Sequence, residues 1–330
     1  MEIKNRNILV LGASGYIGTA IIPFFKKHYS VICLMRKLPE EPHYFEGTKI
    51  LVGDILDNAI LNEFSSMKVH AIINLISLDH YESEDDYEKA LSTNLLPIFK
   101  LFKRENHIKT NFFINISTIH VYSQEQSVFD ESSDLAPKNI YALTHKFAED
   151  TVEYFCTKAN IHGITLRLAN SFGAPRNGND KSWLLVINDL CKKALTQNKI
   201  IISSDGKALR DFIYYDNIAA AIHHILLQKH YPKHYDLYNL SSGMPNSIID
   251  IAVLIQQIVL KKYRRNIDIY INQNQKLDTS LHLSQNERSD KNTTGVVTNA
   301  KLKLTGFKLQ IDLKKGVEAL LNEINEKSIS

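Results

Sequence analysis

The chain has 330 residues, of which 44% are hydrophobic and 23% charged, the composition of an ordinary globular protein with a substantial core. Its net charge is only +3 and its basic residues are dispersed, so we do not expect a nucleic-acid-binding surface. No stretch reaches the roughly 18 apolar residues of a membrane span, and no zinc-ligand spacing occurs, so neither a membrane anchor nor a metal site is expected. The three cysteines are far apart and fit a reducing compartment, which predicts a cytoplasmic protein.

The first two-thirds of the chain alternates short apolar runs with longer amphipathic segments. Strands are predicted at residues 7–11, 31–34, 49–52, 71–75, 112–116 and 163–168. Helices are predicted at residues 16–27, 85–102 and 141–158, the last with an apolar face made by Phe147, Val152 and Phe155. This pattern predicts an α/β fold of the Rossmann type, in which helices cover a doubly wound parallel sheet.

The pattern loosens after Pro175. Helices are predicted at residues 183–195, 217–227, 248–260 and 317–324, and short strands at 200–202 and 238–240. Residues 272–294 are rich in polar side chains and are expected to form a mobile surface loop.

A glycine motif follows the first predicted strand and opens the first helix, in the order Gly12-Ala-Ser-Gly15-Tyr-Ile-Gly18. Glycines at such a turn let the backbone approach a pyrophosphate, which the helix N-terminus stabilises. The motif therefore predicts a site for a dinucleotide.

The second predicted strand ends in Arg36 and Lys37. An acidic residue here would bind the ribose 2′-hydroxyl of NAD(H), whereas arginine can accommodate the 2′-phosphate of NADP(H). We therefore favour NADP(H) over NAD(H). The alternative is that Arg36 is a surface cation at a strand end.

Further motifs follow in a fixed order. They are Gly53-Asp54-Ile55, Asn74-Leu-Ile-Ser77, Ser117-Thr118-Ile-His-Val121-Tyr122, Tyr141, the segment from Arg167 to Pro175, the segment from Arg210 to Asp216, and Tyr238-Asn-Leu-Ser-Ser-Gly243. In this order the chain, over roughly residues 7 to 310, resembles an extended short-chain dehydrogenase/reductase. Within that group it is similar to the NAD-dependent epimerase/dehydratase family, which acts on nucleotide sugars.

The resemblance implies a role for each matched position. The catalytic residues would be Thr118, Tyr141 and His145. The cofactor-binding residues would be Gly12, Ser14, Gly15, Tyr16, Ile17, Gly18, Arg36, Asp54, Ile55, Leu75, Ile76, Ser77 and Asn94, together with Tyr141 and His145. Asn170, Arg210 and, more loosely, Arg288 would bind a nucleotide-sugar substrate. The resemblance also implies a homodimer, with residues 1–172 and 208–242 as the Rossmann domain and residues 173–207 and 243–330 as a smaller C-terminal substrate-binding lobe.

The chemistry of Tyr141 and Thr118 can be read from their side chains. As a sugar hydroxyl and a carbonyl interconvert, Tyr141 can move the hydroxyl proton if its pKa falls from about 10 toward neutrality. Thr118 would hold the reacting oxygen by a hydrogen bond. Alternatively, Thr118 caps the end of its strand and Tyr141 only begins a helix after Pro137.

His145 departs from the family pattern, because it lies four residues after Tyr141, where lysine is usual. Three interpretations remain open. His145 takes the place of lysine, Lys146 swings in, or the redox chemistry is lost and the protein binds nucleotides without turnover. His120 either faces the substrate or packs beneath the fifth strand. We favour the buried position, because alternation puts Thr118 and His120 on one face only if the strand continues.

Taken together, the sequence predicts an NAD(P)-dependent nucleotide-sugar epimerase or reductase. Arg36 favours a reductase that exchanges its cofactor, while the overall resemblance favours an epimerase that retains it. The alternative from a different class is a catalytically impaired protein that binds NAD(P) or nucleotides.

Overall fold

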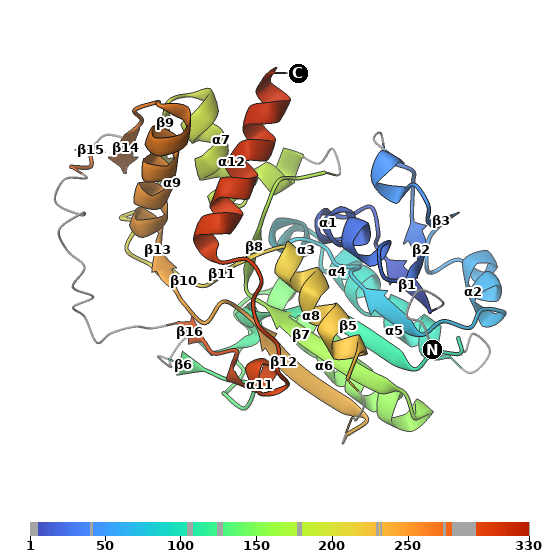
Figure 1. The fold of residues 1–330 in the computed structure, drawn as a ribbon. Coiled ribbons are helices and arrows are strands. Elements are labelled where there is room, and N and C mark those ends of the chain that lie inside the picture. The colour runs from blue at the N-terminus through green and yellow to red at the C-terminus, as the bar shows by residue number, and fades with distance from the viewer. Residues whose placement is uncertain are drawn as a thin grey trace.

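Seven parallel strands form the central sheet of the molecule, in the order β12-β7-β5-β4-β1-β2-β3. The structure, a computed structural model, describes residues 6–39, 42–103, 108–123, 128–176, 180–228, 231, 233–272, 275–278 and 295–329. The strands are β1 (Asn7–Leu11), β2 (Ser30–Met35), β3 (Lys49–Val52), β4 (Ala71–Asn74), β5 (Phe112–Thr118), β7 (His162–Leu168) and β12 (Tyr235–Leu240). This sheet confirms the predicted Rossmann-type α/β fold (Figure 1).

Alternate residues of each strand supply two separate hydrophobic cores, one on each face of the sheet. Ile8 and Val10 of β1 join the core beneath α1 (Tyr16–Phe25) and α8 (Asp216–Leu226). Leu9 and Leu11 join the core beneath helices on the opposite face. Those helices are α2 (Asn58–Ser65), α5 (Leu96–Phe102) and α6 (Ile140–Ala159). Burial on both faces explains why these strands read as continuous apolar runs.

The predicted helix at residues 85–102 is wrong as a single element. The chain forms α3 (His80–Asp85), α4 (Tyr87–Asn94) and α5, because the backbone is extended at Asp86, whose side chain caps α4, and Pro97 starts a new first turn. The helix predicted at 183–195 is likewise divided into the 3₁₀ turn η5 (Asp180–Leu184) and α7 (Val186–Thr196).

A smaller group of elements lies beside the sheet (Figure 1). Helices α7, α9 (Ile248–Tyr263) and α12 (Leu313–Ile329) pack together there. A small sheet accompanies them, made of β9 (Lys199–Ile202), β14 (Asp268–Ile271) and β15 (Gln275–Lys276). Strand β15 falls within the predicted loop at 272–294, most of which lies outside the described residues.

Short strand pairs connect the two groups of elements. Strand β8 (Asn170–Phe172) pairs with β11 (Phe212–Tyr214), and β10 (Leu209–Arg210) pairs with β13 (Asn246–Ser247). A third pair joins β6 (Val128–Phe129) to β16 (Val296–Val297), followed by α11 (Ala300–Leu304). Within the described part of the chain, no helix is long and apolar enough to cross a membrane.

Candidate active site

The glycine motif lies at the carboxyl edge of the sheet, where β1 and β4 are neighbours. The strand that follows β1 in the chain, β2, lies on one side of this pair, and the strand that follows β4, β5, lies on the other. Gly12 has a φ of 74°, a conformation that favours glycine, and a Cβ there would lie 3.2 Å from the backbone of Leu75 and Ile76. A Cβ on Gly18 would lie 2.3 Å from the carbonyl oxygen of Ala13. The turn therefore requires small residues where it approaches β4 and where α1 packs against it.

The first turn of α1 fits a bound phosphate. Gly15 is its N-cap and supplies no side-chain hydrogen bond, so the first backbone N–H groups have no side-chain cap among the described residues. Ser14, Tyr16 and Ile17 adjoin this turn, and the Tyr16 hydroxyl donates to the carbonyl oxygen of Gly173 at 3.0 Å. The backbone N–H groups of this turn suit the pyrophosphate of a dinucleotide, whereas the Tyr16 hydroxyl is engaged with Gly173.

Arg36 and Asp54 lie at the same edge, next to the glycine turn. The N–H of Ala13 donates to the carbonyl of Leu34, and the N–H of Gly53 donates to that of Met35. Arg36 follows directly and is exposed to solvent. Asp54 accepts from the N–H of Leu56 at 2.8 Å, and Ile55 beside it is buried. The predicted adenine and ribose residues are thus brought together.

The segment after β4 joins the carboxyl edge of the sheet to α6. Leu75 is anchored by its N–H to the carbonyl of Leu11. Asn94, predicted to bind the cofactor, is buried, and its carboxamide accepts from the N–H of Leu78 and donates to Thr144 Oγ1 at 2.8 Å. Two of its hydrogen-bonding groups therefore hold the loop of Ile76 and Ser77 against α6.

Helix α6 carries Tyr141 and His145 on one face. Asn139 caps the helix by accepting from the N–H of Ala142, and Glu84 of α3 accepts from the N–H of Ile140 at 2.5 Å. The rings of Tyr141 and His145 are 4.6 Å apart at 73°. The first turn of α6 is therefore fixed from two sides.

Thr118 ends β5 directly beside Tyr141. Its side chain is buried and its hydroxyl accepts from the N–H of His120 at 3.2 Å, which caps the following 3₁₀ turn η4 (Ile119–Val121). Burial raises the pKa of Tyr141 above its usual range, although a hydrogen bond with Thr118 opposes that shift. Thr118 thus both caps the turn after its strand and contacts Tyr141.

His145 is only 5% exposed, and its Nε2 lies 3.0 Å from Ser77 Oγ. Burial, with a smaller contribution from His120, lowers the pKa of His145 to about 4, so the imidazole is neutral near pH 7. Lys146 pairs with Asp150 one turn further along α6. The interpretation in which Lys146 swings toward Tyr141 is therefore wrong for this structure.

His120 contradicts the expectation of a buried histidine beneath the fifth strand. Strand β5 stops at Thr118, and the 3₁₀ turn brings His120 to the surface, with its ring centroid 6.3 Å from that of Tyr141. Partial desolvation, followed by the charges of Arg210 and His80, lowers the pKa of His120.

The predicted substrate residues Asn170 and Arg210 come together although 40 positions separate them in the sequence. Asn170 Nδ2 donates to the carbonyl oxygen of Asp211 at 2.9 Å, because β8 and β11 pair side by side. Asp211 is buried and accepts from the N–H groups of Ser242 and Gly243, which fixes the loop beside Arg210. Arg288 lies outside the described residues.

One buried network was missed from the sequence. Glu149, eight residues after Tyr141, forms an ion pair with Arg167 of β7 at 2.7 Å and accepts from Ser117 Oγ at 2.6 Å. The sequence did contain a signal for Glu149, because positions 141, 145 and 149 share one helix face. Phe147, predicted to pack inward, is instead 44% exposed.

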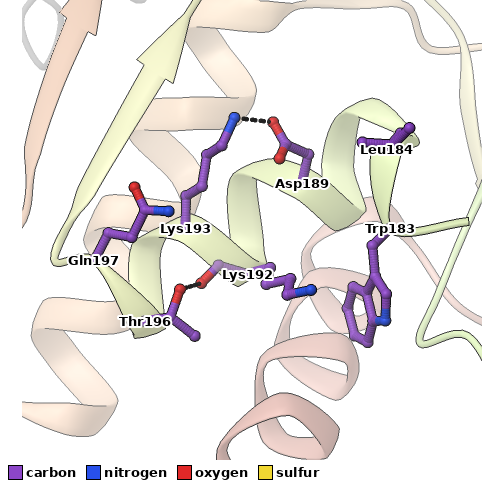
Figure 2. Close-up of a pocket in the computed structure, with 7 residues that line it drawn as sticks. All are labelled: Trp183, Leu184, Asp189, Lys192, Lys193, Thr196 and Gln197. Atoms are coloured by element: carbon purple, nitrogen blue, oxygen red, sulfur yellow. Dashed lines mark hydrogen bonds and ion pairs between the residues drawn. The ribbon is translucent and has the colours of Figure 1, made fainter. Parts of the chain in front are cut away.

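A hollow lies along η5 and α7 (Figure 2). Its basic groups are already engaged, since Lys192 lies over the ring of Trp183 at 5.0 Å and Lys193 pairs with Asp189 at 2.7 Å. Over the described residues, no group of three or more metal-ligating side chains occurs. The residues at the sheet edge therefore make the best candidate site.

Comparison with known proteins agrees with this geometry. Residues 8–241 match the NAD dependent epimerase/dehydratase family. The chain is 22% identical over 340 residues to the dTDP-4-dehydro-6-deoxyglucose reductase of Escherichia coli, with 99% of this chain and 100% of that protein covered.

Two solved structures share the fold. The UDP-glucose 4-epimerase of Thermotoga maritima, with UDP-glucose, has a TM-score of 0.79 at 18% identity and covers 98% of this chain and 100% of that one. The UDP-glucuronic acid 4-epimerase of Bacillus cereus, in complex with UDP-glucuronic acid and NAD, has a TM-score of 0.75 at 19% identity, with coverages of 97% and 99%.

Proposed function

The chain belongs to the NAD dependent epimerase/dehydratase family, as its sequence motifs predict, and we propose that it reduces the carbonyl group of a keto sugar attached to a nucleoside diphosphate. The observation that carries this proposal is a Tyr141 hydroxyl whose pKa is raised by burial, beside a His145 that is neutral near pH 7. Such a tyrosine keeps its proton at neutral pH.

A protonated tyrosine suits reduction better than oxidation. When hydride adds to a carbonyl carbon, the oxygen becomes an alkoxide and needs a proton, which the Tyr141 hydroxyl can donate. Oxidation needs the reverse, a tyrosinate that removes a hydroxyl proton. With His145 neutral, the protein supplies little positive charge to stabilise that tyrosinate. Thr118 would hold the substrate oxygen in line by a hydrogen bond.

The cofactor would lie along the carboxyl edge of the sheet, and when bound it would supply the hydride. Gly12, Gly15 and the first turn of α1 would hold the pyrophosphate, Asp54 the adenine, and Ser77 and His145 the ribose near the nicotinamide. We propose NADP(H) rather than NAD(H), because Arg36 stands where an acidic residue would bind the 2′-hydroxyl.

The substrate would reach from Tyr141 to the smaller lobe. Arg210 would bind the diphosphate and Asn170 would contact the nucleotide-linked sugar, both from the edge of the cofactor domain that faces the smaller lobe. We propose residues 173–207 and 243–330 as the substrate lobe. Residues 1–172 and 208–242 would then form the cofactor domain. The short strand pairs that bring Asn170 to Arg210 support this arrangement.

An epimerase that retains its cofactor is the closest competing function, and a nucleotide-binding protein without turnover is a second. The paired Thr118 and Tyr141 argue against loss of chemistry. The full-length match to a reductase supports exchange of the cofactor at each turnover.

We also propose that the chain acts as a homodimer. Exposed apolar side chains lie on helices that pack against one another, α4, α5 and α6: Tyr87 (56%), Leu91 (43%), Phe99 (47%), Phe147 (44%) and Tyr154 (58%). Large exposed apolar patches on soluble proteins commonly mark interaction surfaces.

The reductase proposal is tested by following NADPH and NADH absorbance with dTDP-4-dehydro-6-deoxyglucose and its UDP and CDP counterparts. We expect oxidation of the reduced cofactor in proportion to the substrate consumed, and loss of turnover by at least 100-fold in Tyr141→Phe, the lower range for general acid catalysis. Sugar interconversion without net cofactor oxidation would instead establish the epimerase. Binding without either reaction would establish the nucleotide-binding protein.

A further inference from the structure

Gly173 lies directly after β8, where the chain leaves the central sheet for the smaller lobe. Its φ is 148°, a conformation that favours glycine, and a Cβ there would lie 1.9 Å from the ring of Tyr215. Its carbonyl oxygen accepts from the Tyr16 hydroxyl at 3.0 Å, and its N–H donates to Asn188 Oδ1 at 3.0 Å. The backbone of one residue therefore contacts both α1, which carries Tyr16, and α7, which carries Asn188.

Asn188 completes this contact from the smaller lobe. It is fully buried, and its Nδ2 donates to the carbonyl oxygen of Ser182 in η5 at 2.9 Å and to the Tyr16 hydroxyl at 3.4 Å. Both polar atoms of its side chain therefore have partners. We call Tyr16, Gly173 and Asn188 the junction, because they tie the first turn of α1 to both η5 and α7.

Tyr16 belongs to two sites at once. It follows Gly15, the N-cap of α1, so its backbone N–H is among those that adjoin the proposed pyrophosphate site. Its side chain extends instead to Gly173 and Asn188, and burial raises the pKa of its hydroxyl, which therefore stays a hydrogen-bond donor. A shift of the turn would move this hydroxyl relative to its partners in the lobe.

Resting on the proposed function, we propose that Tyr16 and Asn188 are positioning residues that couple the cofactor site to the substrate lobe. When the turn holds a dinucleotide, the lobe would bind a nucleoside diphosphate more tightly. By thermodynamic linkage, a bound nucleoside diphosphate would tighten binding of the dinucleotide by the same factor. Neither side chain would touch the reacting atoms.

The burial of the junction makes this coupling large enough to measure. If the turn moved and the lobe did not, a buried hydroxyl or carboxamide would lose its partner. Such a loss corresponds to a change of about 5- to 150-fold in a binding constant. Lys181 of η5 also reaches α3, with Asp79 at 3.8 Å and Glu82 at 3.3 Å, but these ion pairs are exposed and contribute little. The junction therefore carries more of the coupling than these ion pairs.

The experiment measures the dissociation constant of a nucleoside diphosphate by calorimetric titration, with and without saturating NADP⁺. The probes are dTDP, UDP and CDP. We expect NADP⁺ to lower the wild-type dissociation constant by at least about fivefold. Tyr16→Phe, which removes only the hydroxyl, should bring the ratio of the two constants toward one. Thermal unfolding of each variant is measured alongside, because a purely structural role would lower the melting temperature and leave the ratio unchanged.

Tyr29→Phe is the matched control. It also removes the hydroxyl of a buried tyrosine, but that hydroxyl is hydrogen-bonded to His223 Nδ1 at 2.8 Å rather than to the junction. We expect Tyr29→Phe to keep the wild-type ratio. Asn188→Ala removes the junction from the side of the lobe and should also bring the ratio toward one.

The coupling is overturned if the wild-type ratio is one, if Tyr16→Phe keeps the wild-type ratio, or if Tyr29→Phe loses it as well. A wild type that binds NADP⁺ and a nucleoside diphosphate independently, and that oxidises NADPH with a keto sugar nucleotide, would refute the coupling and leave the reductase standing. A wild type that binds neither molecule would remove both.

Discussion

A single side chain, His145, determines whether Tyr141 has a cation beside it. Lysine at this position would remain cationic at neutral pH and would stabilise a nearby tyrosinate, whereas buried His145 has a pKa of about 4 and stays neutral. Its Nε2 is held at 3.0 Å from Ser77 Oγ, so the ring keeps a fixed orientation without a charge. A lysine here would supply both a fixed hydrogen bond and a positive charge, whereas His145 supplies the hydrogen bond alone.

The first prediction concerns His145→Lys and the reverse reaction, oxidation of the sugar alcohol with NADP⁺. Oxidation needs Tyr141 as the tyrosinate. Because the pKa of Tyr141 is raised, the wild-type oxidation rate should keep rising with pH well into the alkaline range. A lysine cation should move the half-maximal pH downward by about one unit, equivalent to about 1.4 kcal/mol. His145→Gln, a neutral control, should leave the profile in place. Identical profiles for the two variants would contradict the electrostatic role.

The second prediction tests the cofactor preference assigned to Arg36. Arg36→Ala should raise the dissociation constant for NADPH by about tenfold or more, since a hydrogen bond to a charged group contributes about 1.5–3 kcal/mol. The dissociation constant for NADH should change little. Lys37→Ala is the matched control, because it removes the adjacent cation. Equal affinities of the wild type for NADPH and NADH would refute the preference.

Among the elements, α6 is held to the sheet by a buried ion pair one turn beyond His145. Glu149 accepts from Arg167 at 3.0 and 2.7 Å and from Ser117 Oγ at 2.6 Å, and both charged residues are almost fully buried. Because β5 and β7 supply Ser117 and Arg167, this cluster fixes α6 relative to the strand that ends in Thr118. The distance between Tyr141 and Thr118 thus depends on it.

The third prediction is that Glu149→Ala lowers the free energy of unfolding by about 3–5 kcal/mol, because it leaves the Arg167 guanidinium buried without its partner. Urea denaturation would measure the change. Asp150→Ala is the control: it removes an acid from the same helix, but its ion pair with Lys146 is exposed and should contribute no more than about 1 kcal/mol. A loss of similar size in both variants would show that Glu149 has no special role.

The elements that the sequence predicted well are those with strong periodicity or an unmistakable turn. Burial on both faces made β1 and β5 readable as apolar runs, and Gly12 located the turn after β1. The break at Asp86 was missed because no glycine marks it. His120 was misplaced because its exposure depends on the 3₁₀ turn after Thr118, which no local pattern in the sequence marks.

At the scale of the whole molecule, the parts missed from the sequence are those made by pairing between distant segments. Strand β12 looked like an isolated short strand, yet it is the seventh strand of the central sheet, paired with β7. The contact between Asn170 and Asp211 depends on the pairing of β8 with β11. Strands of two or three residues carry no periodicity of their own, so only the resemblance of the flanking motifs pointed to their positions.

The last prediction concerns the apolar surface of α4, α5 and α6. Phe147 and Tyr154 lie on the exposed side of α6, and Phe99 of α5 contacts Phe155 at 5.4 Å between ring centroids, so these side chains form one patch. A two-fold dimer would bury the same patch on both copies.

Sedimentation velocity at micromolar concentration should therefore give twice the chain mass of 37.7 kDa for the wild type. Phe147→Lys should give a monomer, because each copy would bring a cation into the apolar interface. Leu304→Lys, at an 88% exposed position on α11, is the control and should remain dimeric. A wild-type monomer would remove the homodimer proposal. A dimer unaffected by Phe147→Lys would place the interface on another face of the molecule.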